Sequence, residues 1–114
     1  MPRFVVLEHD WPTPHFDFLL EAGDVLRAWR LRATPTSGEN AAEANFDHRR
    51  IYLDYEGEVA GGRGTVRRWD AGTFEWVEDA PGRVVVELHG EKLAGRVELC
   101  YGLTSWPNPP GGAG

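Results

Sequence analysis

The chain has 114 residues, enough for one domain that buries its own core. Its hydrophobic fraction of 41% excludes a disordered chain, and no apolar run reaches the roughly 18 residues of a membrane helix, so we expect no membrane partner. Twelve basic against 18 acidic residues give a net charge of −6, which argues against a protein that coats nucleic acid non-specifically by neutralising phosphates. With one cysteine, Cys100, the chain has no intramolecular disulfide or cysteine-based zinc cluster, and we expect a reducing, cytoplasmic location.

Short strands are predicted along almost the whole chain. The segments are rich in β-branched, aromatic or alternating apolar residues, and Gly, Pro or Asp separate them. In chain order they are 3–9, 15–21, 25–31, 50–57, 64–70, 73–78, 83–90 and 95–102. This spacing indicates an all-β antiparallel barrel or sandwich rather than a fold in which strands alternate with helices.

Helix is predicted to be scarce. Residues 38–46 (GENAAEANF) are the best candidate for one or two helical turns, and a loop is the alternative. We expect a single domain over residues 1–104. Residues 105–114, which are rich in Pro and Gly, are expected to form a flexible tail.

The stretch HDWPTPHFD, residues 9–17, is the strongest candidate for chemistry. His15 and Asp17 are two apart on a predicted strand, so both project from one face with Cα atoms about 7 Å apart. Two prolines stiffen the connection from His9 and can return the chain so that His9 lies beside His15. Two imidazoles and a carboxylate suit Mn²⁺, Zn²⁺, Fe²⁺ or Co²⁺ without selecting among them. The alternative is an ordinary surface pair beside a turn.

A second candidate lies in DHRRIYLDYEG, residues 47–57. His48 is placed at the start of a predicted strand, with Tyr52 four residues on and on the same face if the strand is regular. Together with the adjoining Arg49 and Arg50, these side chains form a possible cradle for a phosphate group. The alternative is a strand entry decorated with surface arginines.

All but one of the 12 basic residues are arginines, and most of them cluster near residues 27–32, 49–50 and 63–68. Guanidinium groups favour planar, bidentate contact with phosphate or carboxylate, which fits a local anion site. The alternative is a coding bias that fills surface positions with arginine.

Taken together, these segments resemble the phosphoesterase domain of bacterial DNA ligase D and its stand-alone relatives. The resemblance runs from residue 3 to residue 101 through RFVVLEHDWPTPHFDFLLE, VLRAWRL, DHRRIYLDYEG, GTVRRWDAGTFE and LHGEKLAGRVEL. It implies a compact β-barrel of about eight strands with a polar groove. It also implies a Mn²⁺-dependent enzyme of DNA repair that removes 3′-phosphates and terminal ribonucleotides from DNA ends, with a ligase or polymerase of end joining as partner.

Matching positions carry the implied roles. The resemblance makes His9, His15 and Asp17 the metal ligands, and it makes His48 and Tyr52 the catalytic residues that contact the scissile phosphate.

The chain also departs from the family pattern. The family arginine two residues after the aspartate is Leu19 here, the lysine that follows the tryptophan of VLRAWRL is absent, and the arginine expected before His48 falls near Asn40. The glycine-rich loop after YEG is shortened. We expect Arg30, Arg32 or Arg63 to supply the missing positive charge at the phosphate.

Three functions follow from these observations. The first is a metal-dependent 3′-phosphoesterase that acts on DNA or RNA-containing 3′ ends. The second is a catalytically weakened relative that binds metal or DNA ends without cleavage, which Leu19 and the acidic net charge favour. The third is a hydrolase of small phosphorylated metabolites, which needs no extended basic groove.

Overall fold

The computed structural model describes residues 1–35, 38–100 and 102–106. Within them the chain forms nine strands and one short 3₁₀ helix, and none of the described helices could span a membrane. The elements are β1 (Arg3–His9), β2 (His15–Ala22), β3 (Val25–Leu31), β4 (Gly38–Arg49), η1 (Arg50–Leu53), β5 (Gly57–Glu58), β6 (Thr65–Ala80), β7 (Arg83–Gly90), β8 (Ala94–Cys100) and β9 (Leu103–Trp106).

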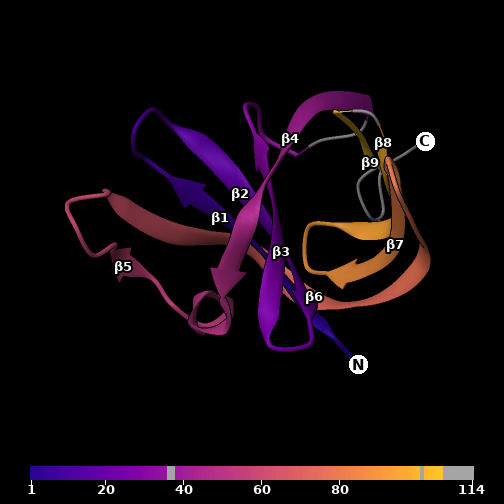
Figure 1. Cartoon of the computed structure of the whole chain (residues 1–114), viewed down its shortest axis with the longest axis horizontal. Helices are drawn as coiled ribbons and strands as arrows, with labels where there is room; N and C mark the ends of the chain where they lie inside the picture. Colours follow the sequence, from indigo (N-terminus) through magenta and orange to yellow (C-terminus); the bar gives the residue numbers. More distant parts are fainter. Residues whose placement is uncertain (36–37, 101, 107–114) are drawn as a thin grey trace.

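Eight of these strands close into a ring. Each neighbour pairs antiparallel in the order β1-β2-β3-β4-β9-β8-β7-β6, and β6 pairs back onto β1. The two-residue β5 adds to β6 outside the ring, at the opposite end of the molecule from β7, β8 and β9 (Figure 1). The prediction of an all-β, barrel-like antiparallel fold with about eight short strands and little helix is confirmed.

The interior of the ring holds the larger of two apolar clusters. Every strand of the ring contributes at least one buried residue to it, and Phe4, Phe18 and Phe74 are among its largest fully buried side chains. On β1 and β2 these residues alternate with others that point outward, as the two-residue period of a strand requires. We call this group the inner cluster.

A second apolar cluster lies on the outer face of β1, β2, β3 and β6. Its buried members are Val5, Leu7, Leu19, Leu26, Ala28, Leu53 and Val66. Leu53 comes from η1, so this short helix covers the outer face of the four strands and removes their apolar residues from water. We call this group the outer cluster.

The segment 38–46, predicted as a helix or loop, is part of strand β4. The prediction is wrong because pairing decides this segment: β4 pairs with β3 on one side and with β9 on the other. Although alanine favours a helix by intrinsic propensity, Ala42 is buried while its neighbours Ala41 and Glu43 are exposed, as in a strand. Tertiary pairing outweighs the weak local preference here.

The predicted strand over 50–57 is also wrong. Its first residues form η1, and the short β5 begins only at Gly57. The 3₁₀ turn is what directs Leu53 into the outer cluster, while Ile51 stays exposed. Burial of one leucine in a second cluster is a tertiary effect that a local alternation pattern does not reveal.

The segments 64–70 and 73–78 form one continuous strand, β6, instead of two. Gly72, read as part of a turn, lies opposite Phe4 of β1 and Gly90 of β7. A Cβ atom at Gly72 would lie 2.1 Å from the carbonyl oxygen of His89, so glycine is required for the close approach of β7. Gly72 therefore allows close contact between β6 and β7 within the ring and does not mark a turn.

Asp70 lies two residues before Gly72 on β6 and explains the HGEKLAG motif. Its buried carboxylate accepts hydrogen bonds from the backbone N–H groups of Glu91 (3.0 Å) and Leu93 (2.8 Å). These bonds fix the turn between β7 and β8 from across the sheet. The WDAGT and HGEKLAG motifs thus have a structural role in this fold.

The described part of the chain ends with strand β9. Strand β9 continues to Trp106, whose ring is buried in the inner cluster. Residues 107–114 lie outside the described part of the chain, so the predicted tail over 105–114 and the domain limit at residue 104 stay predictions.

Candidate metal centre and phosphate pocket

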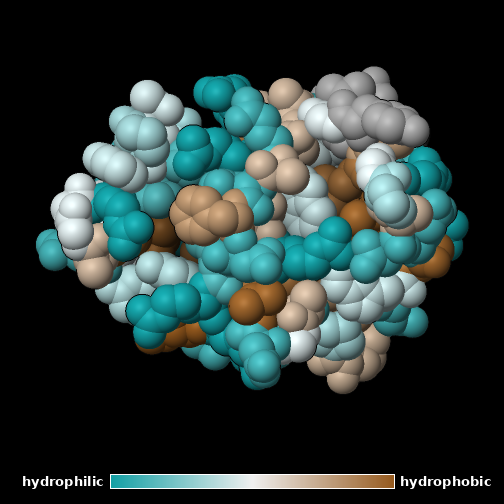
Figure 2. Space-filling view, viewed as in Figure 1, coloured by the Kyte–Doolittle hydropathy of each residue, from teal (hydrophilic) through white to brown (hydrophobic). Residues whose placement is uncertain are grey.

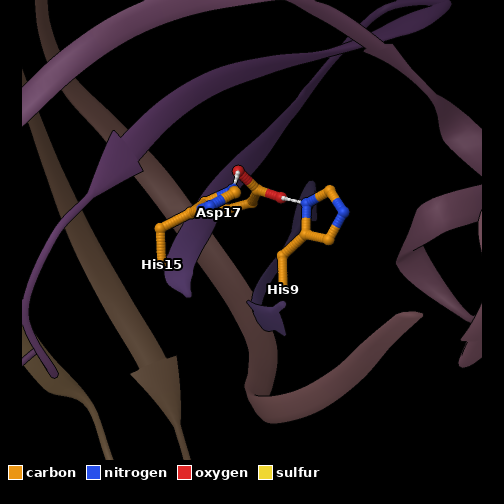
Figure 3. A group of neighbouring side chains, drawn as sticks. All are labelled: His9, His15 and Asp17. Atoms are coloured by element: carbon orange, nitrogen blue, oxygen red, sulfur yellow. Dashed lines mark hydrogen bonds and ion pairs between the residues drawn. The ribbon is translucent and has the colours of Figure 1, made fainter. Parts of the chain in front are cut away.

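His9, His15 and Asp17 meet at the paired ends of β1 and β2. His9 lies directly opposite His15 in the antiparallel register, and Asp17 lies opposite Leu7. All of these residues belong to the outward-facing set of their strands, next to the outer cluster. Figure 3 shows the Asp17 carboxylate between the two imidazoles, with one oxygen toward each.

Two backbone carbonyls fix which ring nitrogen of each histidine points at Asp17. His15 Nδ1 donates to the Thr13 carbonyl at 2.8 Å, and His9 Nε2 donates to the Arg63 carbonyl at 2.9 Å. A carbonyl oxygen can only accept, so these nitrogens carry the protons of the neutral rings. His9 Nδ1 and His15 Nε2 then present lone pairs to the Asp17 oxygens, at 3.0 and 3.1 Å.

This arrangement fits a cation. Lone pairs that face a carboxylate across these distances repel it unless a positive charge lies between them. Two ligands bonded at about 2.0–2.2 Å to one ion are about 3–3.5 Å apart, which agrees with both of the nitrogen–oxygen distances. The three ligand atoms lie within 4.8 Å of one another, and His15 and Asp17 are buried. The spacing, donor types and tautomers therefore suit a divalent metal.

The connection between β1 and β2 is tied to the start of β6 through Asp10. Its carboxylate accepts hydrogen bonds from the Thr65 backbone N–H (2.7 Å) and the Thr65 hydroxyl (2.8 Å). These bonds hold the pKa of Asp10 below its usual range. Gly64 has φ +78°, and a Cβ there would lie 2.2 Å from Asp10 Oδ1 and 2.5 Å from Trp11 Cβ. The connection is therefore held against β6 in one arrangement.

A pocket of about 400 Å³ opens beside the triad. It brings together most of the residues that the sequence singled out, although they come from separate parts of the chain. Its lining includes His9, Asp17, Arg30, His48, Tyr52 and Arg63. The sequence-predicted site residues outside this lining are His15, which is buried, and Arg32, and both line a neighbouring hollow.

A β-bulge places His48 in this pocket. Ala28 pairs with Asn45 and Leu26 pairs with His48, so β4 has one residue more than β3 between these two pairs. Ala28 and Leu26 both face the outer cluster, and the extra residue turns His48 to that same face. In a regular strand Asn45 and His48, three apart, would point to opposite sides.

Tyr52 reaches the pocket from η1 rather than from a strand. Its ring lies edge-to-face with His48, with centroids 6.0 Å apart. The predicted proximity of the two side chains holds, but the reasoning from a regular strand does not. The bulge and the 3₁₀ turn together bring them to one wall.

The three predicted arginines differ in their surroundings. Arg30 pairs with Asp17 in register and lines the pocket, and its Nε is buried with no hydrogen-bond partner among the described residues. Arg63 lines the same pocket while its Nε donates to the Ala60 carbonyl at 2.8 Å. Arg32 forms an ion pair with Glu43 at 3.3 Å and lines a neighbouring hollow beside His15. Arg30 is the best placed of the three to receive an anion.

Leu19 is fully buried in the outer cluster. It follows Asp17 on the same face of β2, so the apolar cluster borders the polar site at this position. The site therefore has a leucine where the resemblance implied an arginine, and packing against neighbours such as Leu26 and Leu53 explains how this leucine is accommodated.

Sequence reasoning missed part of the pocket. Trp11 and Phe46 line it, and both are exposed large hydrophobic residues. Phe46 is two residues before His48, and recognition of β4 as a strand would have associated these two side chains. Trp11 gave no pattern of its own, because it lies in the proline-rich connection.

Comparison with known proteins agrees with this geometry. The family of the DNA Ligase D 3′-phosphoesterase domain matches residues 7–101. The multifunctional non-homologous end joining DNA repair protein LigD of Mycobacterium tuberculosis is 39% identical over an alignment of 106 residues, which covers 84% of this chain and 14% of that protein. The multifunctional non-homologous end joining protein LigD of Pseudomonas aeruginosa is 32% identical over 108 residues, which cover 85% of this chain and 13% of that protein.

The chain thus spans about a seventh of the length of these relatives. The matched segment 7–101 contains the whole triad, the bulge of β4 and η1. A family match over this range, with identity above 30% to relatives across most of the chain, shows that the protein belongs to the DNA ligase D 3′-phosphoesterase domain family.

Proposed function

We propose that this protein is a metal-dependent 3′-phosphoesterase that removes phosphate or a terminal ribonucleotide from DNA or RNA-containing 3′ ends during DNA repair. One observation carries the proposal: His9 and Asp17 of the metal-compatible triad line one pocket with His48, Tyr52 and Arg30, whose Nε is buried without a partner among the described residues. Family membership supports the same activity. The end-joining role in the names of the relatives supports DNA ends as substrate, with a ligase or polymerase as partner.

His9, His15 and Asp17 would hold the metal, for which we propose Mn²⁺, with Zn²⁺, Co²⁺ or Fe²⁺ as alternatives of the same ligand preference. When bound, such an ion supplies Lewis acidity toward a phosphoryl oxygen and activates water for attack on phosphorus. The Thr13 and Arg63 carbonyls keep the two imidazoles in the tautomers that a metal requires.

The remaining pocket residues would act on the phosphate. Arg30, which lies beside Asp17, donates charge-assisted hydrogen bonds to a non-bridging oxygen. His48 protonates the leaving oxygen as a general acid. Tyr52 orients the phosphate through its hydroxyl. Arg63 adds positive charge in the same pocket, whereas Arg32, which lines the neighbouring hollow and is paired with Glu43, contributes little.

Release of inorganic phosphate from a 3′-phosphorylated primer–template in the presence of Mn²⁺ tests this function. We expect turnover that His15→Ala lowers to background. The matched control is His89→Ala, because His89 is an exposed histidine on β7 that pairs with Glu75 and does not line the pocket. Turnover no higher in the parent than in His15→Ala would refute the catalytic role.

The buried Leu19 favours one alternative, a weakened relative that binds metal or DNA ends without cleavage. In that case the parent binds Mn²⁺ and releases no phosphate, and Leu19→Arg creates activity by adding the missing guanidinium. Removal of one donor that stabilises transition-state charge typically costs about 10²–10³ in rate, so restoration is measurable.

With its one cysteine, Cys100, free, we keep the cytoplasm as the proposed location.

A further inference from the structure

Two aromatic rings, Trp11 and Phe46, line the pocket and belong to neither apolar cluster. Trp11 is 43% exposed and Phe46 is 71% exposed. The face shown in Figure 2 is mostly hydrophilic, and its apolar side chains form small separate patches. Single exposed apolar residues are common on protein surfaces, but apolar side chains that line one groove together mark a ligand-binding site, and both rings line this pocket.

The ring of Phe46 is held flat and in place. It stacks on the imidazole of His48 with centroids 5.2 Å apart and an angle of 13° between the planes. His48 Nδ1 also bonds to the Phe46 carbonyl at 3.0 Å, which ties the two residues together at the bulge of β4. With one face of Phe46 against His48, its high exposure leaves the opposite face open to a ligand.

We propose that Phe46, with Trp11 as a second ring in the same pocket, forms a stacking subsite for the nucleobase of the 3′-terminal nucleotide. The inference rests on the proposed function, because it takes the phosphate of that nucleotide to lie at Arg30, His48 and Tyr52. A nucleotide joins a phosphate to a flat aromatic base, and this pocket offers a basic part and an aromatic part side by side. Base–aromatic stacking stabilises bound nucleic acid without regard to sequence.

Such a subsite would recognise ends. An internal base is covered by neighbours on both faces, whereas the last base of a strand has one face uncovered. A fixed ring can therefore stack on a terminal base without disrupting the helix. Stacking also needs no positive surface, which suits a chain whose net charge is −6.

Binding without turnover tests the subsite. Fluorescence anisotropy with a labelled, 3′-phosphorylated primer–template in EDTA compares an ordinary terminal nucleotide with an abasic one. We expect the parent to bind the ordinary end about 5-fold to 100-fold more tightly. Phe46→Ala and Phe46→Leu are expected to lose this preference, because neither has an aromatic face, and Phe46→Trp is expected to keep it. Trp11→Leu should reduce it in part.

Val77→Ala is the matched control, since Val77 is also an exposed hydrophobic residue but lies outside the pocket lining. The preference should persist in this variant, and should not change between about 50 and 200 mM salt because stacking carries no charge. Equal binding of both ends by the parent, or an unchanged preference in Phe46→Leu, would overturn the subsite. Absence of phosphate release with Mn²⁺ would instead refute the proposed function and leave this binding result intact.

Discussion

The inner and outer faces of β1, β2 and β3 consist of alternating residues of the same strands, but they differ in what they bury and in the structural features that build them. On β2, Phe18 points into the inner cluster, which all eight strands of the ring share. Asp17 and Leu19, its neighbours, point outward to the metal triad and to the smaller outer cluster. The inner face is determined by alternation alone, whereas the outer face depends on local exceptions.

Two such exceptions build the site. The bulge in β4 turns His48 outward, and the 3₁₀ turn η1 brings Tyr52 and Leu53 over the outer face. One consequence is a division of tasks: the inner face stabilises the ring, and the outer face carries polar groups that an apolar core could not satisfy. Substitutions on the two faces should therefore have separable effects.

The largest effect is expected for Asp17→Asn on the outer face. Loss of outer-shell partners typically weakens metal binding 10-fold to 100-fold, so loss of a direct carboxylate ligand should exceed about 100-fold. The amide can donate to the lone pair of His9 Nδ1 or His15 Nε2, so the metal-free fold should keep its stability. Calorimetric titration with Mn²⁺ and urea unfolding measure the two quantities, and parental Mn²⁺ affinity would contradict the assignment.

Phe18→Ala should show the opposite behaviour. Phe18 is fully buried between Phe4, Trp29 and Trp106, so truncation leaves a cavity in the inner cluster. We expect a loss of about 3–5 kcal/mol in the free energy of unfolding, measured by urea denaturation. At temperatures where the variant is still folded, its Mn²⁺ affinity should match that of the parent. A joint loss of both would mean that the two faces are not independent.

A smaller effect separates two arginines on the outer side. Arg30→Gln should weaken binding of a 3′-phosphorylated end by about 10-fold to 150-fold, because a charge-assisted hydrogen bond contributes about 1.5–3 kcal/mol. Arg32→Gln should have little effect, since Arg32 is paired with Glu43 and lies outside the pocket with His48. Fluorescence anisotropy in EDTA measures the dissociation constant of each variant for the 3′-phosphorylated end. An equal loss of affinity in the two variants would contradict the proposal that Arg30 binds the phosphate.

The smallest effect concerns pH. The Arg3 guanidinium donates a hydrogen bond to Asp54 at the end of η1 and holds the pKa of that carboxyl below its usual range. A lowered folded-state pKa means that the ionised carboxylate stabilises the fold above its ordinary pKa, and that this contribution disappears as pH falls through the lowered value. The unfolding temperature of Asp54→Asn should therefore fall slightly less on acidification than that of the parent. Identical acid profiles would show that this exposed pair contributes nothing.

Most of the ring could be predicted from the sequence, because alternation and turn residues are local signals. His15 and Asp17 are likewise two apart on one strand, and that spacing alone placed them on one face. The position of His48 could not be predicted in this way. Its orientation depends on one extra residue in β4, which appears only when the register with β3 is known.

Strand β4 carries another lesson about variation in chain length. Insertion or deletion of one residue in a regular strand exchanges its buried and exposed faces, and such a change is rarely tolerated. In β4 the bulge separates Ala42, which packs inward, from His48, which points outward. Because of the extra residue, the alternation of inward and outward side chains restarts after the bulge, so the residues before it and after it each keep their own orientation. This strand is therefore one of the places in the ring where a change in length by one residue would leave the core intact, at the cost of the histidine's orientation.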